Sequence, residues 1–600
     1  MTNVLTDLIN SRTALYGANR EAFKYKNGST WESTSWTALK ESVDNIAAAF
    51  EILGIEECQN IAIFSANRPE IVISDFAAYA NRVVPISLYA TSSQDQVEYI
   101  VNDARCGMIL VGDQKQYEIA RKALDKCPTL KQIITFDEIT PNDGDTATMT
   151  FSHLMKLGEK ASEKTREEVA ARSSRAQADD IATIIYTSGT TGEPKGAVLP
   201  HSCFNAVMRI HKERLTNLSD KDTSLCFLPL SHIFEKAWTY FCRWMGINVA
   251  INNDPREIQT AIKEVRPTCM CSVPRFWEKV YTAVQEKLTE ASKLERWIAS
   301  MALNVGRRRN LKYVRTGQKV PWLTEKLYQF FFRKVFLPMQ KAIGVENGNI
   351  FPTAGAPLSA NIVEFMHSCG INIVVGYGLS ETTATVTCYP LFNYEIGTCG
   401  TTMPEVNVKI GDNNEILVKG PTVMRGYYNK PEATAEAFTA DGWFRTGDAG
   451  YFDENGELVL TERIKDLFKT SNGKYIAPQA LESRLGEDKY IEQVAVIGDK
   501  RKYVTAIIIP AFEALKEYAH KKHIQYRNME ELLKNADIKK MIQERIDRLQ
   551  ENFAGFERIK KFTLLPQAFT MEAGELTNTL KIRRPVINSH YAREIEAMYA

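Results

Sequence analysis

Apolar residues recur at two different spacings along the first part of the chain. Residues 36–55 carry them every three to four positions, which predicts an amphipathic helix, and residues 70–82 repeat that spacing. Residues 60–65, 83–89 and 107–112 are short apolar runs, which predict buried strands. Strands that alternate with helices in this way are typical of a mostly parallel α/β sheet. The polar stretch that follows, up to about residue 180, predicts a surface helix and a linker.

The alternation continues in the middle of the chain. Residues 181–185 predict a buried strand and residues 202–215 a helix, with a loop of small residues between them. We expect the N-terminus of that helix to face an anion bound by the loop. Further strands and helices are predicted over 225–253, 268–274 and 347–383. Their loops should gather at one edge of a sheet, where open α/β folds usually bind ligands.

From about residue 400 the pattern changes to short alternating strands and tight turns, which predicts a small antiparallel section. Strands at 493–499 and 503–510, with amphipathic helices at 512–553, then predict a compact α+β unit. We therefore expect an α/β fold with a large N-terminal domain of α/β sheets, residues 1–464, and a small C-terminal domain, residues 465–600.

Composition narrows the class of function. The 600 residues hold 74 Lys and Arg against 73 Asp and Glu, a formal charge of +1, which argues against a general nucleic-acid binder. The 11 cysteines lack metal-site spacing, so we expect free thiols in a reducing compartment. Because we find neither a signal-peptide pattern nor an apolar run of membrane-spanning length, we expect a cytoplasmic protein whose membrane contact, if any, is peripheral.

The loop YTSGTTGEPKG, residues 186–196, has the chemistry to hold phosphate. Its glycines let backbone N–H groups approach an anion, its hydroxyls can donate hydrogen bonds, and Lys195 adds a charge. It is not a G-x-x-x-x-G-K-[ST] loop, because Gly196 follows the lysine. A surface turn rich in Gly and Thr is the alternative. The candidate phosphate-binding residues are Thr187, Ser188, Gly189, Thr190, Thr191, Gly192 and Lys195.

This loop resembles the signature loop of the acyl-adenylate-forming superfamily, which contains acyl-CoA synthetases, adenylation domains and luciferases. Six motifs, along nearly the whole chain, stand in the order typical of that superfamily. The resemblance implies that ATP and a carboxylic acid form an acyl-adenylate, that the loop holds the pyrophosphate, and that the small C-terminal domain is mobile.

The segment GYGLSETT, residues 376–383, places a ring and a carboxylate after a predicted strand. A tyrosine can lie against a flat base and a glutamate can hold a hard cation, while a helix start is the alternative. The resemblance implies that Tyr377 stacks on adenine and that Glu381 binds Mg²⁺. It also implies nucleotide contacts for Gly378, Ser380 and Thr382, and for the backbone of Gly355 and Ala356 in TAGAPLS. The superfamily more often has threonine where Ser380 stands.

Two later motifs complete the predicted nucleotide site. Asp448, in GWFRTGD, could accept hydrogen bonds from both ribose hydroxyls, and a hairpin turn is the alternative. The resemblance implies that Asp448 binds ribose, that Arg463 binds ribose or phosphate, and that Lys581 is the adenylation lysine. By composition alone, Lys581 would belong to a solvated basic tail.

The segment between the predicted domains resembles the superfamily's hinge. The resemblance implies that Lys465 is the hinge residue and that the loop at Gly473 moves toward the thiol of coenzyme A. Asn472 departs from the commoner Ser-Gly-Gly at this loop, but asparagine tolerates the left-handed conformation that glycine favours.

Two residues are candidates for the acyl pocket and its gate. His232, in PLSHIFE, resembles a residue that gates the acyl pocket in related synthetases, although a lone histidine beside aromatic residues is more often structural. Trp277, in VPRFWEK, resembles the aromatic gate to the fatty-acid tunnel of long-chain fatty acyl-CoA synthetases. An ordinary core tryptophan is the alternative.

Residues 279–345 predict a basic and aromatic helical insertion, which long-chain enzymes carry and smaller-acid synthetases usually lack. Its cations and rings could lie against an anionic bilayer through about 305–341. The alternative is a helix pair that packs its rings inward and leaves its cations in solvent. The aromatic candidates are Trp322, Phe330, Phe331, Phe332 and Phe336.

Together the motifs predict an AMP-forming long-chain fatty acid:CoA ligase with ATP and coenzyme A as co-substrates and Mg²⁺ as cofactor. Two alternatives remain: a fatty acyl-AMP ligase that loads a carrier protein, and a non-catalytic acyl or nucleotide sensor that keeps the fold. A monomer and a homodimer both fit the sequence. The expected location is the cytoplasm, at the inner face of the membrane if the insertion docks there.

Overall fold

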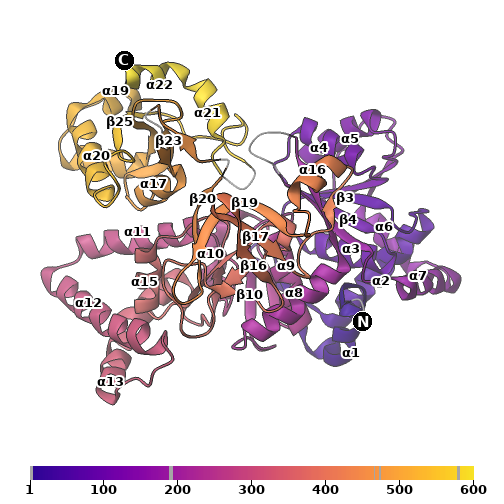
Figure 1. The fold of residues 1–600 in the computed structure, drawn as a ribbon. Coiled ribbons are helices and arrows are strands. Elements are labelled where there is room, and N and C mark those ends of the chain that lie inside the picture. Colours follow the sequence, from indigo (N-terminus) through magenta and orange to yellow (C-terminus); the bar gives the residue numbers. More distant parts are fainter. Residues whose placement is uncertain (1–3, 188–192, 465, 472–473, 578–580) are drawn as a thin grey trace.

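The structure is a computed structural model, and it describes residues 4–187, 193–464, 466–471, 474–577 and 581–600. Figure 1 shows a large body and a smaller C-terminal part beside it. The strand and helix alternation predicted for the N-terminal region is confirmed, because a parallel five-stranded sheet runs in the order β4-β3-β5-β6-β7. Its strands are β3 (Asn60–Phe64), β4 (Val84–Leu88), β5 (Met108–Val111), β6 (Gln132–Thr135) and β7 (Thr148–Thr150), and nearby helices are α2 (Trp36–Ile52), α3 (Pro69–Ala80), α4 (Gln94–Asp103) and α5 (Gln114–Lys126).

Burial explains the unbroken apolar runs in this sheet. Strands β3, β4 and β5 are buried along their whole length, as expected of a parallel sheet covered on both faces. The polar region before residue 180 forms α6 (Phe151–Glu159) and α7 (Glu163–Arg175). Because α7 has no buried residue, the predicted surface helix is confirmed.

The strand that leads into the predicted phosphate loop, β8 (Ile181–Thr187), forms an antiparallel hairpin with β9 (Lys195–Pro200). Helix α8 (His201–Arg214) begins directly after β9. The expectation that the N-terminus of α8 faces an anion in the loop is wrong, because β9 first carries the chain away from the loop. The first N–H groups of α8 donate to backbone instead, His201 to Asp180 O at 3.0 Å and Ser202 to Ala178 O at 2.7 Å.

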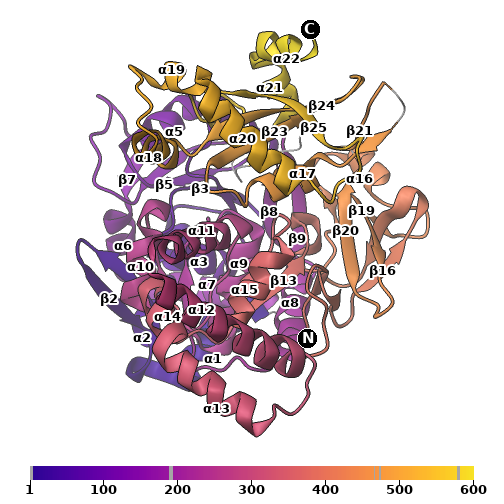
Figure 2. The ribbon, with the colours of Figure 1, turned by 90° about the vertical axis from the view of Figure 1, so that its left-hand side faces the viewer.

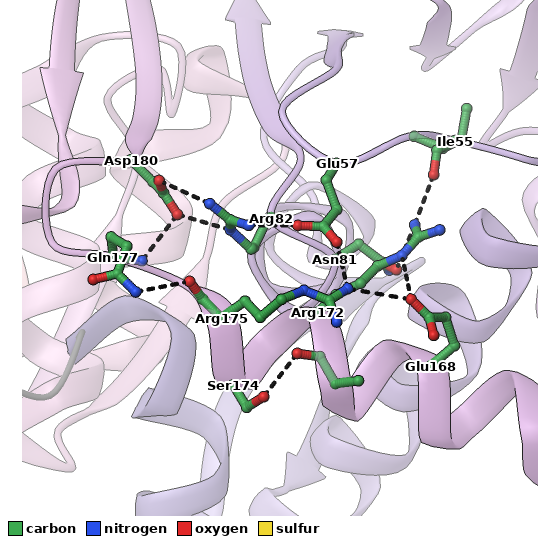
Figure 3. A network of polar contacts seen from close by, with 11 residues as sticks. Ile55, Glu57, Asn81, Arg82, Glu168, Arg172, Ser174, Arg175, Gln177 and Asp180 are labelled. Carbon is green, nitrogen blue, oxygen red and sulfur yellow. Dashed lines mark hydrogen bonds and ion pairs between the residues drawn. The ribbon is translucent and has the colours of Figure 1, made fainter.

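A network of ion pairs fastens the segment that enters β8. Arg82, which follows α3, binds the Asp180 carboxylate through two N–H groups at 2.9 and 3.1 Å (Figure 3). It also pairs with Glu57, which pairs in turn with Arg175 of α7. Since Asp180 immediately precedes β8, these contacts hold the start of the loop-bearing strand against the parallel sheet.

The remaining sheets of the body surround the site described below. One, in the order β10-β11-β1-β2, contains an N-terminal hairpin, and another runs β12-β13-β14-β15. The strand predicted over 268–274 is wrong, because this segment makes only single bridges, among them Cys269–Ser224 and Ser272–Thr353. The elements are α1 (Val4–Tyr16), β1 (Glu21–Asn27), β2 (Thr30–Ser35), β10 (Thr223–Cys226), α9 (Ile233–Met245), β11 (Asn248–Ile251), α10 (Ile258–Val265), β12 (Phe351–Thr353), α15 (Ala360–Ser368), β13 (Ile373–Tyr377), β14 (Thr387–Cys388) and β15 (Thr401–Thr402).

The antiparallel section predicted after residue 400 is confirmed as a sheet in the order β16-β17-β19-β20. Strand β18 (Gly426–Tyr427) leaves this section and pairs with β9 of the loop-bearing hairpin. Strand β18 therefore connects the antiparallel section to the hairpin that carries the predicted phosphate loop. Its elements are β16 (Asn407–Ile410), β17 (Glu415–Lys419), α16 (Pro431–Ala437), β19 (Phe444–Phe452) and β20 (Leu458–Arg463).

The C-terminal part has its own apolar cores on the two faces of the sheet β23-β24-β25. Strands β23 (Ile491–Ile497) and β24 (Val504–Pro510) match the predicted pair, and β25 (Ile559–Leu564) joins in parallel. The predicted fold class, with a smaller α+β domain, is confirmed. Its other elements are β21 (Phe468–Lys469), β22 (Tyr475–Ile476), α17 (Pro478–Leu485), α18 (Phe512–Lys521), α19 (Met529–Lys534), α20 (Ala536–Leu549), α21 (Arg584–His590) and α22 (Ala592–Tyr599).

A helical arm projects from the body at the lower left of Figure 1, as predicted for the insertion. Figure 2 shows α12 and α13 at the surface, away from the C-terminal part. Gly306 lets the arm approach α15 closely, since a Cβ there would lie 2.1 Å from Ser368 O. The arm comprises α11 (Pro274–Glu290), α12 (Lys293–Gly306), a π-helical segment (Arg307–Val314), α13 (Trp322–Phe331), a second π-helical segment (Phe332–Phe336) and α14 (Leu337–Ile343).

Candidate functional site

Tyr377, Asp448 and Arg463, predicted from separate motifs, meet in the structure. The Tyr377 hydroxyl donates to Asp448 Oδ2 at 2.7 Å, and Arg463 Nε donates to Asp448 Oδ1 at 3.2 Å. Asp448 and Arg463 are cross-strand partners on β19 and β20, which places their side chains on one face of the sheet. The hairpin-turn alternative for Asp448 is wrong, because this residue lies inside β19. Burial and the Asp448 carboxylate raise the pKa of Tyr377, so its phenol stays protonated and donates.

Glu381 belongs to a second contact beside this one. It lies in a single 3₁₀ turn, Ser380–Thr382, after β13, and its Oε1 accepts from the Tyr427 hydroxyl at 2.9 Å. The Lys195 Nζ lies 5.1 Å from the centre of the Tyr427 ring. Burial and Glu381 raise the pKa of Tyr427, which keeps the hydroxyl a donor. Glu381, Tyr377, Tyr427, Asp448 and Arg463 are called the polar cluster below.

Tyr427 was missed by the sequence reasoning. It stands in RGYYN, between the predicted strands of the antiparallel section, and no single property of this segment marks it as functional. The signal that could have found it is the pair of tyrosines after a glycine, because an aromatic hydroxyl so placed can reach a neighbouring loop. Pairing of β18 with β9 brings Tyr427 to Lys195.

The other predicted residues of GYGLSETT shape the turn itself. The Leu379 N–H donates to Thr382 Oγ1 at 2.9 Å, so the hydroxyl of this fully buried threonine caps the turn, as in the helix-start alternative. Ser380 is also buried. Gly378 is required sterically, because a Cβ there would lie 2.2 Å from Ala384 O.

The loop that carries Gly355 and Ala356 follows β12. Gly355 has a φ of +95°, a left-handed conformation that favours glycine, and Ala356 is exposed. Ala354 and Tyr377 line the same cavity, so this loop borders the polar cluster. The predicted contacts of Gly355 and Ala356 with adenine remain predictions.

Of the predicted phosphate loop, the structure describes its two ends. Thr187 and Lys195 face each other across the hairpin, and Thr187 Oγ1 donates to Lys195 O at 3.3 Å. The predicted residues Ser188, Gly189, Thr190, Thr191 and Gly192 lie outside the described residues, as do the predicted hinge Lys465 and the coenzyme A loop residue Gly473.

Lys581 comes from the C-terminal part to the same place. Its side chain keeps exposed surface, but many protein atoms surround it. Desolvation by these atoms and the Arg463 guanidinium lower the pKa of Lys581 to about 8. The carboxylates Asp448, Asp466 and Glu381 act in the opposite direction and raise it. This desolvation and the charges of Arg463, Asp448 and Glu381 that act on Lys581 place its ammonium group next to the polar cluster. This environment differs from the solvated tail that composition alone suggested.

His232 lies within electrostatic reach of Lys581. Its Nδ1 accepts from the Phe234 N–H at 3.2 Å, so the ring caps the start of α9. Burial, and then the Lys581 charge, lower the pKa of His232 to about 4, which makes it neutral at pH 7. His232 thus caps a helix at a position that the Lys581 charge reaches, and it is not among the residues that line the cavity described next.

An apolar cavity of about 50 Å³ is lined in part by Tyr377. Its walls come from α8, α9 and the strands β12, β13 and β14. The space corresponds to about two water-sized groups, so a long chain would require wall side chains to move. Apolar wall residues include Val207, Leu215, Phe234, Ala237, Trp238, Phe241 and Val374. Nothing in the sequence marks this wall as an acyl site, because apolar helix residues look the same in an ordinary core.

Trp277, the predicted gate, lies in the protein core. It is fully buried, and its Nε1–H donates to Ser272 Oγ at 2.8 Å and to Thr353 Oγ1 at 3.0 Å. Its ring packs edge-on against Phe276 and Phe351. These contacts agree with the core alternative, since Trp277 does not line the cavity and bonds Thr353, which does.

The helical arm exposes an unusual number of large apolar side chains. Trp322 and Phe330 are 68% and 58% exposed, whereas Phe331 and Phe336 are buried and pack inward, as the helix-pair alternative expected. Helix α12 adds apolar residues that the sequence reasoning missed. We call the exposed set the arm surface; it comprises Leu294, Trp297, Met301, Trp322, Leu323, Leu327 and Phe330.

Family models match both parts of the chain. A model described as AMP-binding enzyme matches residues 11–428, and one described as AMP-binding enzyme C-terminal domain matches residues 465–600. "Long-chain-fatty-acid--CoA ligase FadD15" of Mycobacterium bovis is 32% identical over 95% of this chain and 92% of its own length. "Long-chain-fatty-acid--CoA ligase 1" of Homo sapiens is 29% identical over 95% of this chain and 83% of its own length.

Solved structures share the fold at lower identity. The A-PCP didomain of carboxylic acid reductase from Segniliparus rugosus, in complex with AMP, superposes with a TM-score of 0.75 at 20% identity, over 99% of this chain and 82% of that one. The anthranilate CoA ligase AuaEII, in complex with anthranoyl-AMP, gives a TM-score of 0.73 at 16% identity, over 99% of this chain and 98% of that one.

Proposed function

Because this chain belongs to the AMP-binding enzyme family, we infer that it is an AMP-forming ligase that joins a long-chain fatty acid to coenzyme A at the expense of ATP. The observation that carries this function is the position of Tyr377. Its hydroxyl belongs to the polar cluster, while the residue also lines the apolar cavity. A fatty acid whose tail enters the cavity therefore presents its carboxylate next to a nucleotide held by the polar cluster.

The polar cluster and two lysines divide the work of adenylation in this proposal. Asp448 accepts the ribose hydroxyls, Tyr377 lies against adenine, and Arg463 binds ribose or phosphate. Lys195 holds the departing pyrophosphate, and Lys581 stabilises the charge that grows on the attacked phosphorus. The fatty carboxylate attacks the α-phosphorus, the bond to pyrophosphate breaks, and acyl-AMP forms.

The residues present fit a magnesium ion. Among the described residues no group of three or more His, Cys, Asp or Glu could hold a metal by protein ligands alone. Mg²⁺ commonly needs only one or two carboxylates, because substrate phosphates and water complete its shell. Glu381 would hold it, and the ion would neutralise phosphate charge when bound.

In the second step the coenzyme A thiol attacks the acyl carbonyl and AMP leaves. We propose that the chain divides into domains 1–464 and 465–600, that the C-terminal domain turns about Lys465, and that the Gly473 loop then replaces Lys581 at the site. The match of separate family models to the two parts supports this division.

The proposed activity is tested with purified protein, ATP, magnesium and palmitic acid. We expect pyrophosphate release on addition of the acid and AMP release only when coenzyme A is also present. A fatty acyl-AMP ligase that loads a carrier protein would form acyl-AMP without this dependence on coenzyme A, and a non-catalytic sensor would release neither product. Competition among saturated acids from short to long in the same assay checks the long-chain preference.

We also propose that the arm surface docks on an anionic bilayer, from which it collects fatty acid. Two tryptophans and five other large apolar residues form the arm surface, and exposed Arg296, Lys326, Arg333 and Lys334 accompany it. The Lys326 Nζ lies 4.3 Å from the centre of the Trp322 ring, so charge and apolar area stand together. Anionic headgroups attract such cations while the rings enter the interface. Within the described residues, none of the helices is both long enough and apolar enough to cross a bilayer.

Co-sedimentation with phosphatidylserine-containing vesicles tests the docking. The double variant Trp322→Ser and Phe330→Ser should reduce the bound fraction about tenfold, since each removes an interfacial ring. The matched control is Tyr451→Ser, an aromatic residue of β19 that is 50% exposed and outside the arm. Equal sedimentation of the double variant and the parent, or equal binding to uncharged vesicles, would remove the proposal.

A further inference from the structure

The apolar cavity contains a hydroxyl without a partner. Thr387 lines the cavity, is 1% exposed, and its Oγ1 makes no hydrogen bond with any described residue. A buried hydroxyl left unpaired costs about 1–3 kcal/mol, so such groups in native proteins usually serve a ligand or a water molecule. Strand β14 therefore carries a polar group toward a space that is otherwise mostly apolar.

His211, on α8, lines the same cavity and leaves one ring nitrogen available. Its Nδ1 lies 2.8 Å from Val207 O, and because a carbonyl oxygen only accepts, Nδ1 carries the hydrogen. Burial lowers the pKa of His211 to about 4, so the ring is neutral at pH 7. In a neutral imidazole whose Nδ1 is protonated, Nε2 holds a lone pair and accepts hydrogen bonds.

Contacts between α8 and β14 place the two residues on neighbouring walls. Arg214, three residues after His211 and on the same face of α8, donates to Cys388 O at 2.8 Å. It also donates to Thr401 Oγ1 at 2.9 Å. Cys388 directly follows Thr387 in β14, so the face of α8 that carries His211 packs against this strand.

We propose that His211 and Thr387 recognise a hydroxyl group carried along the fatty-acid chain, so that hydroxylated long-chain acids are the preferred substrates. The substrate hydroxyl donates to Nε2 of His211 and accepts from the Thr387 hydroxyl. A keto group forms only the second bond, and a plain methylene forms neither. The inference rests on the proposed function, because it assumes that the cavity receives the acyl chain.

The test compares palmitic acid with its positional monohydroxy isomers in the CoA-dependent release of AMP by the full-length protein. At least one isomer should exceed palmitic acid in kcat/KM by about 5- to 10-fold, as expected from one or two hydrogen bonds. Thr387→Val keeps the shape but removes the hydroxyl, and it should lower kcat/KM for the preferred isomer to that for palmitic acid measured with the same variant. Thr387→Ser restores a hydroxyl and should retain the preference.

Thr135→Val is the matched control. Thr135, in β6, is also fully buried with no hydrogen bond to its hydroxyl among the described residues, but it does not line the cavity. This variant should keep the parent's preference. The inference is overturned if the parent prefers palmitic acid over every isomer, or if the preference survives in Thr387→Val. Release of AMP with none of the acids would contradict the proposed function, and this inference with it.

Discussion

Tyr377 belongs to two different environments, because its hydroxyl joins charged and hydroxyl side chains through hydrogen bonds, whereas the residue also lines a small cavity with mostly apolar walls. The polar cluster fixes its geometry through directional bonds between distant segments of the chain. The cavity depends on packing, which tolerates changes of similar volume but not added bulk. Substitutions in the polar cluster should therefore change the KM for ATP, and substitutions at the cavity should change the KM for the fatty acid.

Loss of the Lys581 charge should give the largest effect. In Lys581→Ala we expect pyrophosphate release to fall about 100- to 1000-fold, because a charge placed at the reacting phosphoryl group stabilises the transition state. Thioester formation from supplied acyl-AMP should change little. Lys560→Ala, an exposed lysine of β25, is the control. Adenylation at the parent rate in Lys581→Ala would remove this residue from the mechanism.

Removal of the Asp448 charge tests the polar cluster. Asp448→Asn should raise the KM for ATP about tenfold and leave the KM for fatty acid nearly unchanged, since Arg463 and Tyr377 lose their anionic partner. Tyr377→Phe alone should raise the KM for ATP by less than Asp448→Asn does. Because the two side chains share a hydrogen bond, the double variant should be non-additive by about 1 kcal/mol. A fatty-acid KM that changes as much as the KM for ATP would break the division between the two sides.

A bulkier residue in the cavity wall should raise the KM for fatty acids and leave the KM for ATP unchanged. Val374→Phe adds bulk to a cavity wall and should raise the KM for long-chain acids about fivefold, with ATP binding unchanged. The KM values for acids of different length give the readout. An unchanged KM for every acid would show that the acyl chain takes another path.

The smallest effect is expected from a substitution of Glu462, which lies on the opposite face of β20 from Arg463. Glu462 is 7% exposed, and burial followed by the Glu482 charge raises its pKa from 4.5 to about 8, although the Arg584 charge opposes this rise. The protonated, neutral carboxyl of Glu462 is more stable than the carboxylate in this buried environment. Its contribution to stability is therefore complete below pH 4.5 and is lost as the pH rises to about 8.

Thermal unfolding between pH 5 and 9 measures this contribution. Glu462→Gln should remove the loss of stability, so that its Tm exceeds that of the parent by about 3 °C at the alkaline end and by less at the acidic end. Parallel curves for the two proteins would show that Glu462 does not carry the effect. The change should leave the KM for both substrates unaltered, because Glu462 faces away from Asp448.

The sequence predicted more of the polar cluster than of the cavity. Tyr377, Glu381, Asp448 and Arg463 stand in short motifs that resemble those of the acyl-adenylate-forming superfamily, so their positions could be inferred before the structure. Tyr427 could not, because only the pairing of β18 with β9 brings it to Glu381 and Lys195.

The cavity and one helix illustrate why the rest was hidden. The residues that line the cavity on α8 and α9 have the same apolar spacing as any buried helix face, and the sequence carries no mark of a space between them. The prediction that the N-terminus of α8 faces a bound anion was wrong because residues 195–200 were expected to be the end of a loop, whereas they form β9. Unbroken apolar runs such as those of β3 and β4 were predicted well, since burial on both faces of the sheet leaves a clear pattern.

Tyr377 lines the cavity while its hydroxyl bonds to Asp448, and this double membership has a consequence for the redesign of the enzyme. A residue shared by both substrate sites couples their binding free energies, so a chain that presses on the ring also alters the affinity for ATP. Libraries that seek new acids should leave position 377 fixed and vary Leu215, Trp238 or Val374, which line the cavity and do not belong to the polar cluster.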